Sequence, residues 1–169
     1  QPTGEPPVAK GWRADTVTEA LPQAWAMAWL PDGRILVTGK EGTLHLVTGG
    51  KVQAVPMEGL PAVFASGQGG LLDIAIHPAD KGPNVRVYMT LANGSSSENR
   101  TILVQGNFDG KKLAGIKTLL RASPSKSGGQ HFGSRLAWLA DGTLLMSIGD
   151  GGNPPQRVGN MLARDQAQN

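Results

Sequence analysis

Two stretches of this chain repeat one another without a gap. WLPDGRILVTGKEG at 29–42 aligns with WLADGTLLMSIGDG at 138–151, and the Trp, the Leu, the Asp-Gly pair and the following apolar run coincide. A degenerate third copy, AIHPADKGPNVRVYMT, lies between them at 75–90. Each copy is a strand, a turn and a second strand. Such a unit, repeated at intervals of tens of residues, is typical of a β-propeller, in which each blade buries its faces against its neighbours.

Apolar runs bounded by turn residues predict short strands along most of the chain. They fall at 26–30, 34–39, 43–49, 50–55, 70–78, 85–92, 101–108 and 113–122, and within 134–150. The polar stretch NGSSSENR at 93–100 is predicted to be a loop. Helical periodicity is weak, and the 24 glycines and 12 prolines suit many short strands joined by turns.

The predicted fold class is therefore all-β, and within it a β-propeller. Blades of about 40–50 residues give a chain of 169 residues about three, whereas propellers have about four to eight. We expect 1–20 to be an N-terminal arm with a possible outer strand, and 21–169 to be the N-terminal blades of a single propeller domain. The remaining half would lie elsewhere in the protein or on another chain. A complete sandwich of seven or eight strands is the alternative.

Composition excludes several classes of site. The chain has no cysteine, which rules out disulfides, thiolate metal sites and cysteine nucleophiles. No apolar run reaches 18 residues, so no membrane-spanning helix is predicted. The net charge is +3 and the basic residues are scattered, so no nucleic-acid partner is expected. The polar, Pro-rich start fits a mature N-terminus after signal removal, or an internal boundary.

His131 is the first candidate for chemistry. Gly128 and Gly129 precede it and Gly133 follows it, which lets the backbone turn sharply and leaves the imidazole approachable. A histidine titrates near neutrality and is suited to abstracting a proton from a hydroxyl. The alternative is a surface-loop histidine without a role.

Three further polar residues stand out. Asp150 ends an apolar run, where its carboxylate could orient His131; it could also be a turn residue, or offer an oxygen to calcium. Gln68 lies among glycines, and its amide could hold a substrate hydroxyl or a cofactor carbonyl, unless it is only a polar loop residue. Asp73 lies inside an apolar strand, where a carboxylate is costly unless hydrogen-bonded, and is expected to be structural. His77 and His45 are expected in a turn and at an exposed strand position.

Taken in order, WAMAWLPDGRILVT, GQGGLLDIAIHPAD and HFGSRLAWLADGTLLMSIGD resemble the soluble PQQ-dependent sugar dehydrogenases, which include aldose sugar, glucose and sorbosone dehydrogenases. The resemblance runs from about Trp25 to the end of the chain and covers the N-terminal half of the family fold. It implies a six-bladed β-propeller that binds pyrroloquinoline quinone (PQQ) above calcium, in proteins that are periplasmic or secreted. HFGSRL is closer to the aldose-type HFGGRL, which implies a broad aldose specificity.

The resemblance also implies roles for the candidates. His131 would be the general base that takes the proton of the anomeric hydroxyl while hydride passes to the quinone, giving a lactone. Asp150 would orient this base and face the substrate. Gln68 would face both the reacting oxygen and PQQ, which His131 would also contact.

The later blades of the family supply the basic residues around the quinone and most calcium ligands, so this chain alone is expected to hold an incomplete site and no metal ligands of its own. The electron acceptor is not indicated by any motif. A non-catalytic propeller that binds a sugar or a protein remains the alternative function, although such a binder has no evident need for a general base.

Overall fold

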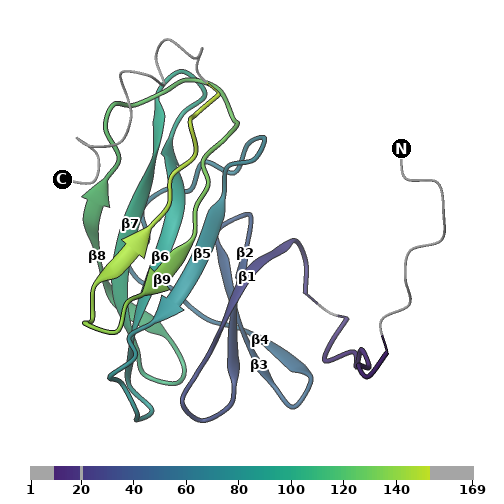
Figure 1. The fold of residues 1–169 in the computed structure, drawn as a ribbon. Helices are drawn as coiled ribbons and strands as arrows, with labels where there is room; N and C mark the ends of the chain where they lie inside the picture. Colours follow the sequence, from purple (N-terminus) through teal and green to yellow (C-terminus); the bar gives the residue numbers. More distant parts are fainter. Residues whose placement is uncertain (1–9, 20, 153–169) are drawn as a thin grey trace.

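A computed structural model describes residues 10–19 and 21–152 of the chain (Figure 1). Ten strands and no helix occur in this part. Blade 1 is an antiparallel sheet of β1 (Ala24–Trp29), β2 (Ile35–Gly39), β3 (Thr43–Thr48) and β4 (Lys51–Ala54). Blade 2 contains β5 (Leu71–Ile76), β6 (Val85–Gly94), β7 (Asn99–Phe108) and β8 (Leu113–Arg121). Blade 3 is represented by the hairpin of β9 (Leu136–Trp138) and β10 (Leu144–Met146).

The three sheets are arranged as successive propeller blades. Each four-stranded sheet is an up-and-down meander, and every strand pairs with its neighbour in the sequence. The first strands lie side by side, because β1 packs on β5 and β5 contacts β9 (Figure 1). The propeller prediction is confirmed, with two whole blades and two strands of a third. The alternative of one two-sheet sandwich does not hold.

The sequence repeat is the first hairpin of each blade. In blade 1 the N–H of Leu30 donates to the carbonyl of Arg34 (2.8 Å), and in blade 3 Leu139 donates to Thr143 at the same distance. In each turn the aspartate of the Asp-Gly pair accepts the N–H two residues later, at 3.1 and 2.9 Å. Such side-chain acceptance stabilises a tight turn.

The degenerate middle copy makes the same bonds across a longer loop. The N–H of His77 donates to the carbonyl of Arg86 (3.0 Å), and Asp80 accepts the N–H of Arg86 (2.6 Å). The loop 78–84 is longer than the turn 31–33 of blade 1, but the same kinds of hydrogen bond close both. All three copies are therefore one structural unit.

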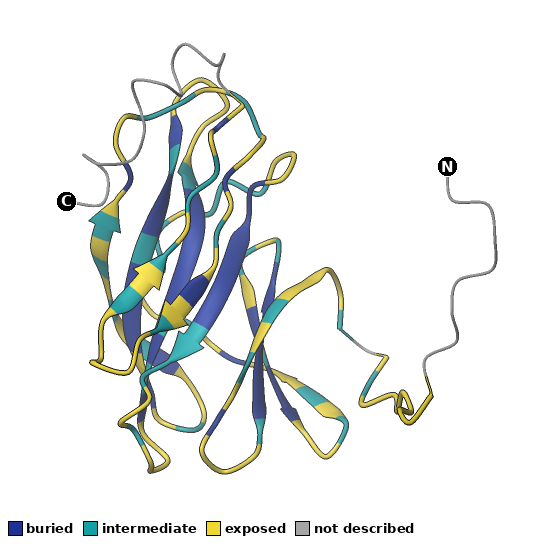
Figure 2. Cartoon of the chain, in the orientation of Figure 1, coloured by how far each residue is buried: buried dark blue, intermediate teal, exposed yellow. Residues whose placement is uncertain are grey.

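The core lies between the blades. Leucine, isoleucine and methionine side chains from β2, β3, β5 and β6 are buried between blades 1 and 2 (Figure 2), among them Leu36, Leu44, Leu46, Leu71, Ile74, Met89 and Leu91. A second cluster on the other side of blade 2 contains Leu72, Ala92 and Phe132, with Phe64 against it. Blade 2 therefore packs on both of its faces, which holds the segment before β9 in a fixed place.

The outer face of β1 is not covered by the described residues. Ala26 and Ala28 face the core, whereas Trp25, Met27 and Trp29 alternate with them and are 43%, 60% and 63% exposed. Exposed apolar patches of this kind are typical of interaction surfaces.

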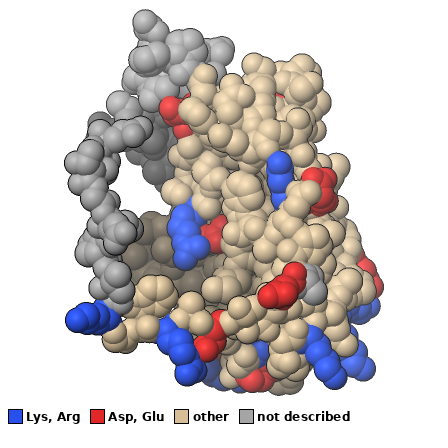
Figure 3. Space-filling view, turned by 90° about the vertical axis from the view of Figure 1, so that its right-hand side faces the viewer, with Lys and Arg blue, Asp and Glu red and all other residues tan. Residues whose placement is uncertain are grey.

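One local prediction differs from the structure. The predicted loop at 93–100 is shorter, because β6 and β7 stay paired from Val85–Phe108 to Gly94–Asn99 and leave only residues 95–98 as the turn. The predicted arm has no strand in residues 10–19, and residues 1–9 and 20 lie outside the described part. In the face of the molecule shown in Figure 3, basic and acidic side chains are interspersed. Within the described residues no helix has the length and hydropathy to span a membrane.

Candidate active site

The three candidate residues lie at the same end of neighbouring blades. His131 precedes β9 and Asp150 follows β10, so the hairpin brings both to its open end. Main-chain hydrogen bonds continue this pairing beyond the two strands. The N–H of Ser147 donates to the carbonyl of Arg135 (2.9 Å), and the N–H of Gly151 donates to the carbonyl of His131 (3.1 Å). Gln68 precedes β5, the strand of blade 2 that contacts β9.

The imidazole of His131 is paired with the Asp150 carboxylate. The Nδ1 and Oδ1 atoms are 2.6 Å apart, and the two side chains are about half exposed, at 51% and 48%. The pKa of the Asp150 carboxyl is held below its usual range, first by the N–H of Gly152 (2.8 Å) and then by His131. Because an exposed pair contributes little to stability, this contact does little to hold the fold together.

The pairing fixes which imidazole nitrogen is available. An ionised carboxylate only accepts hydrogen bonds, so the proton of a neutral imidazole lies on Nδ1. The opposite nitrogen, Nε2, then carries the lone pair. His131 can therefore accept a proton at Nε2 while Asp150 stabilises the cation that forms.

Gln68 contacts His131 through the main chain. Its Oε1 accepts the N–H of His131 (2.8 Å), and its own N–H donates to the carbonyl of Gly129 (2.6 Å). His131 has a φ of +54°, an uncommon conformation for a residue with a side chain. The bond to His131 uses one of the two lone pairs of Oε1, and the Nε2 group carries two hydrogens that can be donated to a ligand.

Close backbone packing requires glycine beside His131. A Cβ at Gly149 would lie 2.2 Å from the carbonyl oxygen of His131, and a Cβ at Gly67 would lie 2.3 Å from that of Gly129. The two glycines let the segment around His131 approach both the end of β10 and the loop before β5.

Phe132 anchors the segment from behind. Its side chain is 1% exposed and packs against Phe64, with ring centroids 6.3 Å apart. The ammonium of Lys126 lies 3.7 Å from the ring centroid of Phe132, and burial lowers the pKa of this lysine. Thr101 donates its hydroxyl to the carbonyl of Phe132 (3.1 Å). The only sequence signal of this anchor is an apolar residue next to a histidine.

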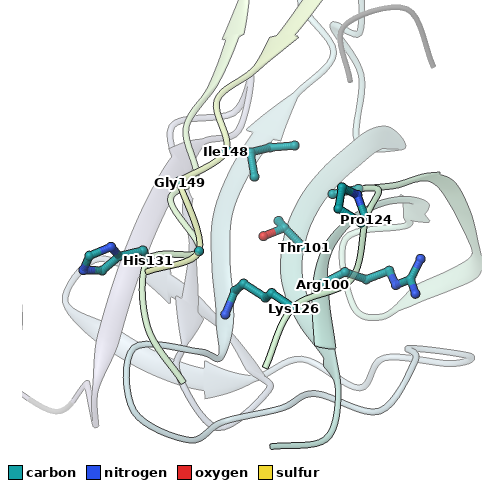
Figure 4. A pocket seen from close by; sticks show the side chains of 9 residues that line it. Arg100, Thr101, Pro124, Lys126, His131, Ile148 and Gly149 are labelled. Carbon is teal, nitrogen blue, oxygen red and sulfur yellow. The ribbon is translucent and has the colours of Figure 1, made fainter. Parts of the chain in front are cut away.

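A small pocket lies behind the same segment, lined by residues that include Thr101, Pro124, Lys126 and Ile148 (Figure 4). It measures about 20 Å³, room for about one water molecule. The imidazole of His131 lies on the other side of the chain at Gly149 and points away from this pocket (Figure 4). The pocket is therefore a gap beneath the loop and not the place where a ligand would meet the imidazole.

Asp73 proves to be tied to the same segment. Its side chain is 3% exposed; Oδ2 accepts the N–H of Leu136 (2.5 Å) and Oδ1 accepts Nη1 of Arg135 (3.2 Å). The sequence signal, a carboxylate inside an apolar strand, correctly indicated that Asp73 is hydrogen-bonded, but it did not indicate which residues are its partners.

The other two histidines lie away from this site. His77 is beside the turn of the blade 2 hairpin, where its Nδ1 is 2.9 Å from Arg86 and its ring packs on Trp138. His45 is half-buried in β3, next to the Thr43 hydroxyl. Among the described residues, no group of three or more His, Cys, Asp or Glu side chains could hold a metal ion.

Comparison with known proteins matches this chain to one family. The family described as Glucose / Sorbosone dehydrogenase matches residues 21–169. A protein of Synechocystis, slr1608, is 46% identical over 165 residues, which are 93% of this chain and 40% of that protein. The aldose sugar dehydrogenase YliI of Escherichia coli is 32% identical over 145 residues, which are 83% of this chain and 39% of that enzyme.

Solved structures of sugar dehydrogenases are also similar to this chain. A crystal structure of a glucose dehydrogenase has a TM-score of 0.75 and 31% identity, over 84% of this chain and 42% of that one. The PQQ-bound form of an aldose sugar dehydrogenase from Streptomyces coelicolor has a TM-score of 0.66 and 31% identity, over 82% of this chain and 41% of that one. The chain thus spans about two fifths of the length of the curated relatives it matches.

Proposed function

The chain belongs to the glucose/sorbosone dehydrogenase family, and we propose that it is the N-terminal part of a PQQ-dependent enzyme that oxidises aldose sugars at the anomeric carbon to lactones. The aldose sugar dehydrogenase from Escherichia coli and the PQQ-bound structure from Streptomyces coelicolor support the reaction class. The observation that carries the proposal is the 2.6 Å contact between His131 Nδ1 and Asp150 Oδ1, with Gln68 bound to the main chain of the same histidine.

In the proposed reaction, His131 is the general base. Its Nε2 accepts the proton of the anomeric hydroxyl, and loss of hydride from the anomeric carbon leaves the carbonyl of the lactone. Asp150 keeps Nδ1 protonated and stabilises the imidazolium that results. PQQ, when bound, supplies the acceptor for the hydride.

The donor chemistry around His131 fits one edge of a quinone. Gln68 offers the two hydrogens of Nε2, which suit a carbonyl oxygen of the cofactor or the reacting oxygen of the sugar. We assign Gln68 and His131 to the cofactor side of the site, and Gln68 and Asp150 to the substrate side. Among the described residues no group of three or more His, Cys, Asp or Glu side chains could hold a metal ion. As the resemblance implies, the calcium ligands are proposed to come from the later blades, outside this chain.

The proposed domain organisation is based on the exposed apolar face of β1. Residues 21–169 would form the first blades of one propeller, and the exposed stripe of Trp25, Met27 and Trp29 on β1 would be covered by the remaining blades. Residues 1–20 would form the arm. As the resemblance implies, the protein would be periplasmic or secreted.

Reconstitution tests the proposal. The full-length gene product and this chain are each mixed with PQQ and calcium, and dye reduction is followed with a panel of aldoses. We expect turnover in the full-length protein and little or none in this chain. Turnover in this chain would mean that a second copy supplies the missing groups.

A variant separates catalysis from binding. His131→Gln removes the base and is expected to lower kcat by a factor of about 10²–10⁴, while sugar binding, measured by calorimetry, changes little. The matched control is His77→Gln at the opposite end of the blade. Dye reduction that survives His131→Gln unchanged would contradict the role of His131 as the base. A full-length protein that folds and binds sugar without turnover would favour the non-catalytic binding module.

A further inference from the structure

Two side chains of blade 2 hold the same segment of blade 3 at its two ends. Gln68 and Asp73 are five residues apart, and they accept the N–H groups of His131 and Leu136, which are also five residues apart. The sequence separation is 63 residues in each case. The segment 131–136 therefore lies alongside the start of β5 in a register that both side chains fix.

We propose that Asp73 is a positioning residue for His131, and that with Gln68 it forms a two-point clamp that aligns the base in blade 3 with the ligand-facing amide in blade 2. The inference rests on the proposed function, in which these two groups act on one substrate. Asp73 itself does not reach the reacting atoms in this scheme. It acts by fixing where blade 3 begins.

The surroundings of Asp73 match this role. A carboxylate that is 3% exposed is costly in the interior unless hydrogen bonds satisfy it. Both of its oxygens are used, and both donors belong to residues 135 and 136 at the start of β9. The side chain of Arg135 is 76% exposed, so the bond to the buried N–H of Leu136 is the stronger of the two constraints.

The middle of the segment is held as well. The hydroxyl of Ser134 donates to Oγ1 of Thr90 (2.6 Å), and the same oxygen accepts the N–H of Asp73 (3.0 Å). Thr90 is fully buried. Asp73 is thereby part of one connected polar network that joins β5, β6 and the segment 131–136.

The clamp is separate from the His131–Asp150 pair. Both members of that pair lie on the β9–β10 hairpin and its continuation, so they move together. Gln68 lies on blade 2. Weakening the clamp should therefore misalign His131 relative to Gln68 without separating His131 from Asp150. This separation predicts a lower kcat with an unchanged pH dependence.

The test uses the full-length protein and the variant Asp73→Asn. The amide oxygen of asparagine can still accept the N–H of Leu136. The substitution removes the negative charge, however, and places an N–H₂ donor opposite the guanidinium of Arg135. We expect kcat for dye reduction to fall about 10- to 100-fold, with a smaller change in KM and the same midpoints in the pH profile of kcat. Hydrogen exchange in the peptide covering 131–136 is expected to accelerate.

The matched control is Thr38→Val. Thr38 is fully buried and ties blade 1 to blade 2 by donating to the carbonyl of Leu72 (2.7 Å). Its loss removes a comparable buried bond between blades, but on the side away from His131. It should change thermal stability while leaving kcat and exchange in 131–136 at their wild-type values.

A double-mutant cycle tests the clamp as a unit. Gln68 and Asp73 make no hydrogen bond to each other among the described contacts, so independent roles would give multiplicative losses in kcat. If both hold one segment, Asp73→Asn should cost clearly less in a Gln68→Ala background than in the wild type. Should Asp73→Asn fail to fold, Arg135→Gln at an exposed site removes one bond of Asp73, and faster exchange in 131–136 is expected there too.

Three results would overturn the inference: Asp73→Asn behaving like Thr38→Val, a shift of the pH midpoints together with kcat, or strictly multiplicative effects in the cycle. If the wild-type protein reduces no dye under any condition, the proposed function fails instead. Exchange in 131–136 then still decides whether Asp73 holds the segment.

Discussion

Replacing Gly149 by alanine should separate His131 from its surroundings without straining the backbone conformation of residue 149. Gly149 is not among the glycines with positive φ, so an alanine is tolerated by the backbone itself. Its Cβ, however, would lie 2.2 Å from the carbonyl oxygen of His131 and 2.7 Å from the carbonyl carbon. Both atoms belong to the main chain, which cannot rotate away as the end of a flexible side chain can.

The size of the displacement follows from these contacts. Real Cβ atoms essentially never approach a heavy atom more closely than 3.0 Å, so the gap of 2.2 Å has to widen by about 0.8 Å. A misplacement of about 1 Å can cost roughly 100-fold in rate. We therefore expect kcat of the reconstituted full-length enzyme to fall about 100-fold, and the free energy of unfolding to fall by about 1–3 kcal/mol as in other overpacked sites.

The assay pairs dye-linked kcat and KM with urea unfolding. Gly82→Ala is the matched control, because Gly82 has no heavy atom within 4 Å of the added Cβ and no positive φ. That variant should keep its activity and lose no stability. If Gly149→Ala retains the wild-type kcat while Gly82→Ala behaves as expected, the close approach of His131 to the end of β10 is not needed for turnover and the reasoning fails.

Three further changes test other parts of the structure. Phe132→Ala removes a side chain that is 1% exposed, and urea unfolding should show a loss of about 3–5 kcal/mol; a loss below about 1 kcal/mol would contradict the anchoring role. Asp150→Asn should lower kcat at least about 100-fold with little change in KM, because the amide does not stabilise the imidazolium; steady-state kinetics decide, and an active variant would dismiss Asp150. Asp80→Asn should lower stability by about 1 kcal/mol at pH 7, where Arg86 holds the pKa of Asp80 below its usual value. Since the folded pKa is the lower one, this contribution is complete above the unfolded pKa and is lost as the pH falls through the folded pKa, so melts of the variant and the wild type should converge in acid and not in base.

The blade pattern was predictable because it is local. Each first hairpin closes through bonds between residues four apart at 30–34 and 139–143, and an Asp-Gly turn carries its own acceptor. Those signals survive even in the 77–86 copy, where the loop is longer. The shortened turn at 95–98 was not predictable in this way, since polar residues at 93–94 and 99–100 are drawn into strands by pairing between β6 and β7.

The pairing of His131 with Asp150 was also within reach of the sequence. Both residues flank one hairpin, 19 positions apart, so the strand pattern alone brings them to the same end. Gln68 was proposed only through its glycine neighbours and the family resemblance. Its main-chain bond to His131 spans 63 residues, and no periodicity in either segment encodes it.

Asp73 illustrates which part of the site could not be predicted from the sequence. The sequence indicated that burying this carboxylate in an apolar strand is costly and that it needs hydrogen-bond donors. It did not indicate the donors themselves, which are an N–H and a guanidinium on the next blade. Such bonds depend on how one blade packs against the next, which is set by the core around Leu72, Ala92 and Phe132. The proton-transfer half of the proposed site therefore needs only blades 2 and 3, whose first strands, β5 and β9, are in contact. A cofactor and a calcium ion bound by later blades would meet a base that the first blades have already aligned, and for that reason the clamp should be measurable before either ligand is added.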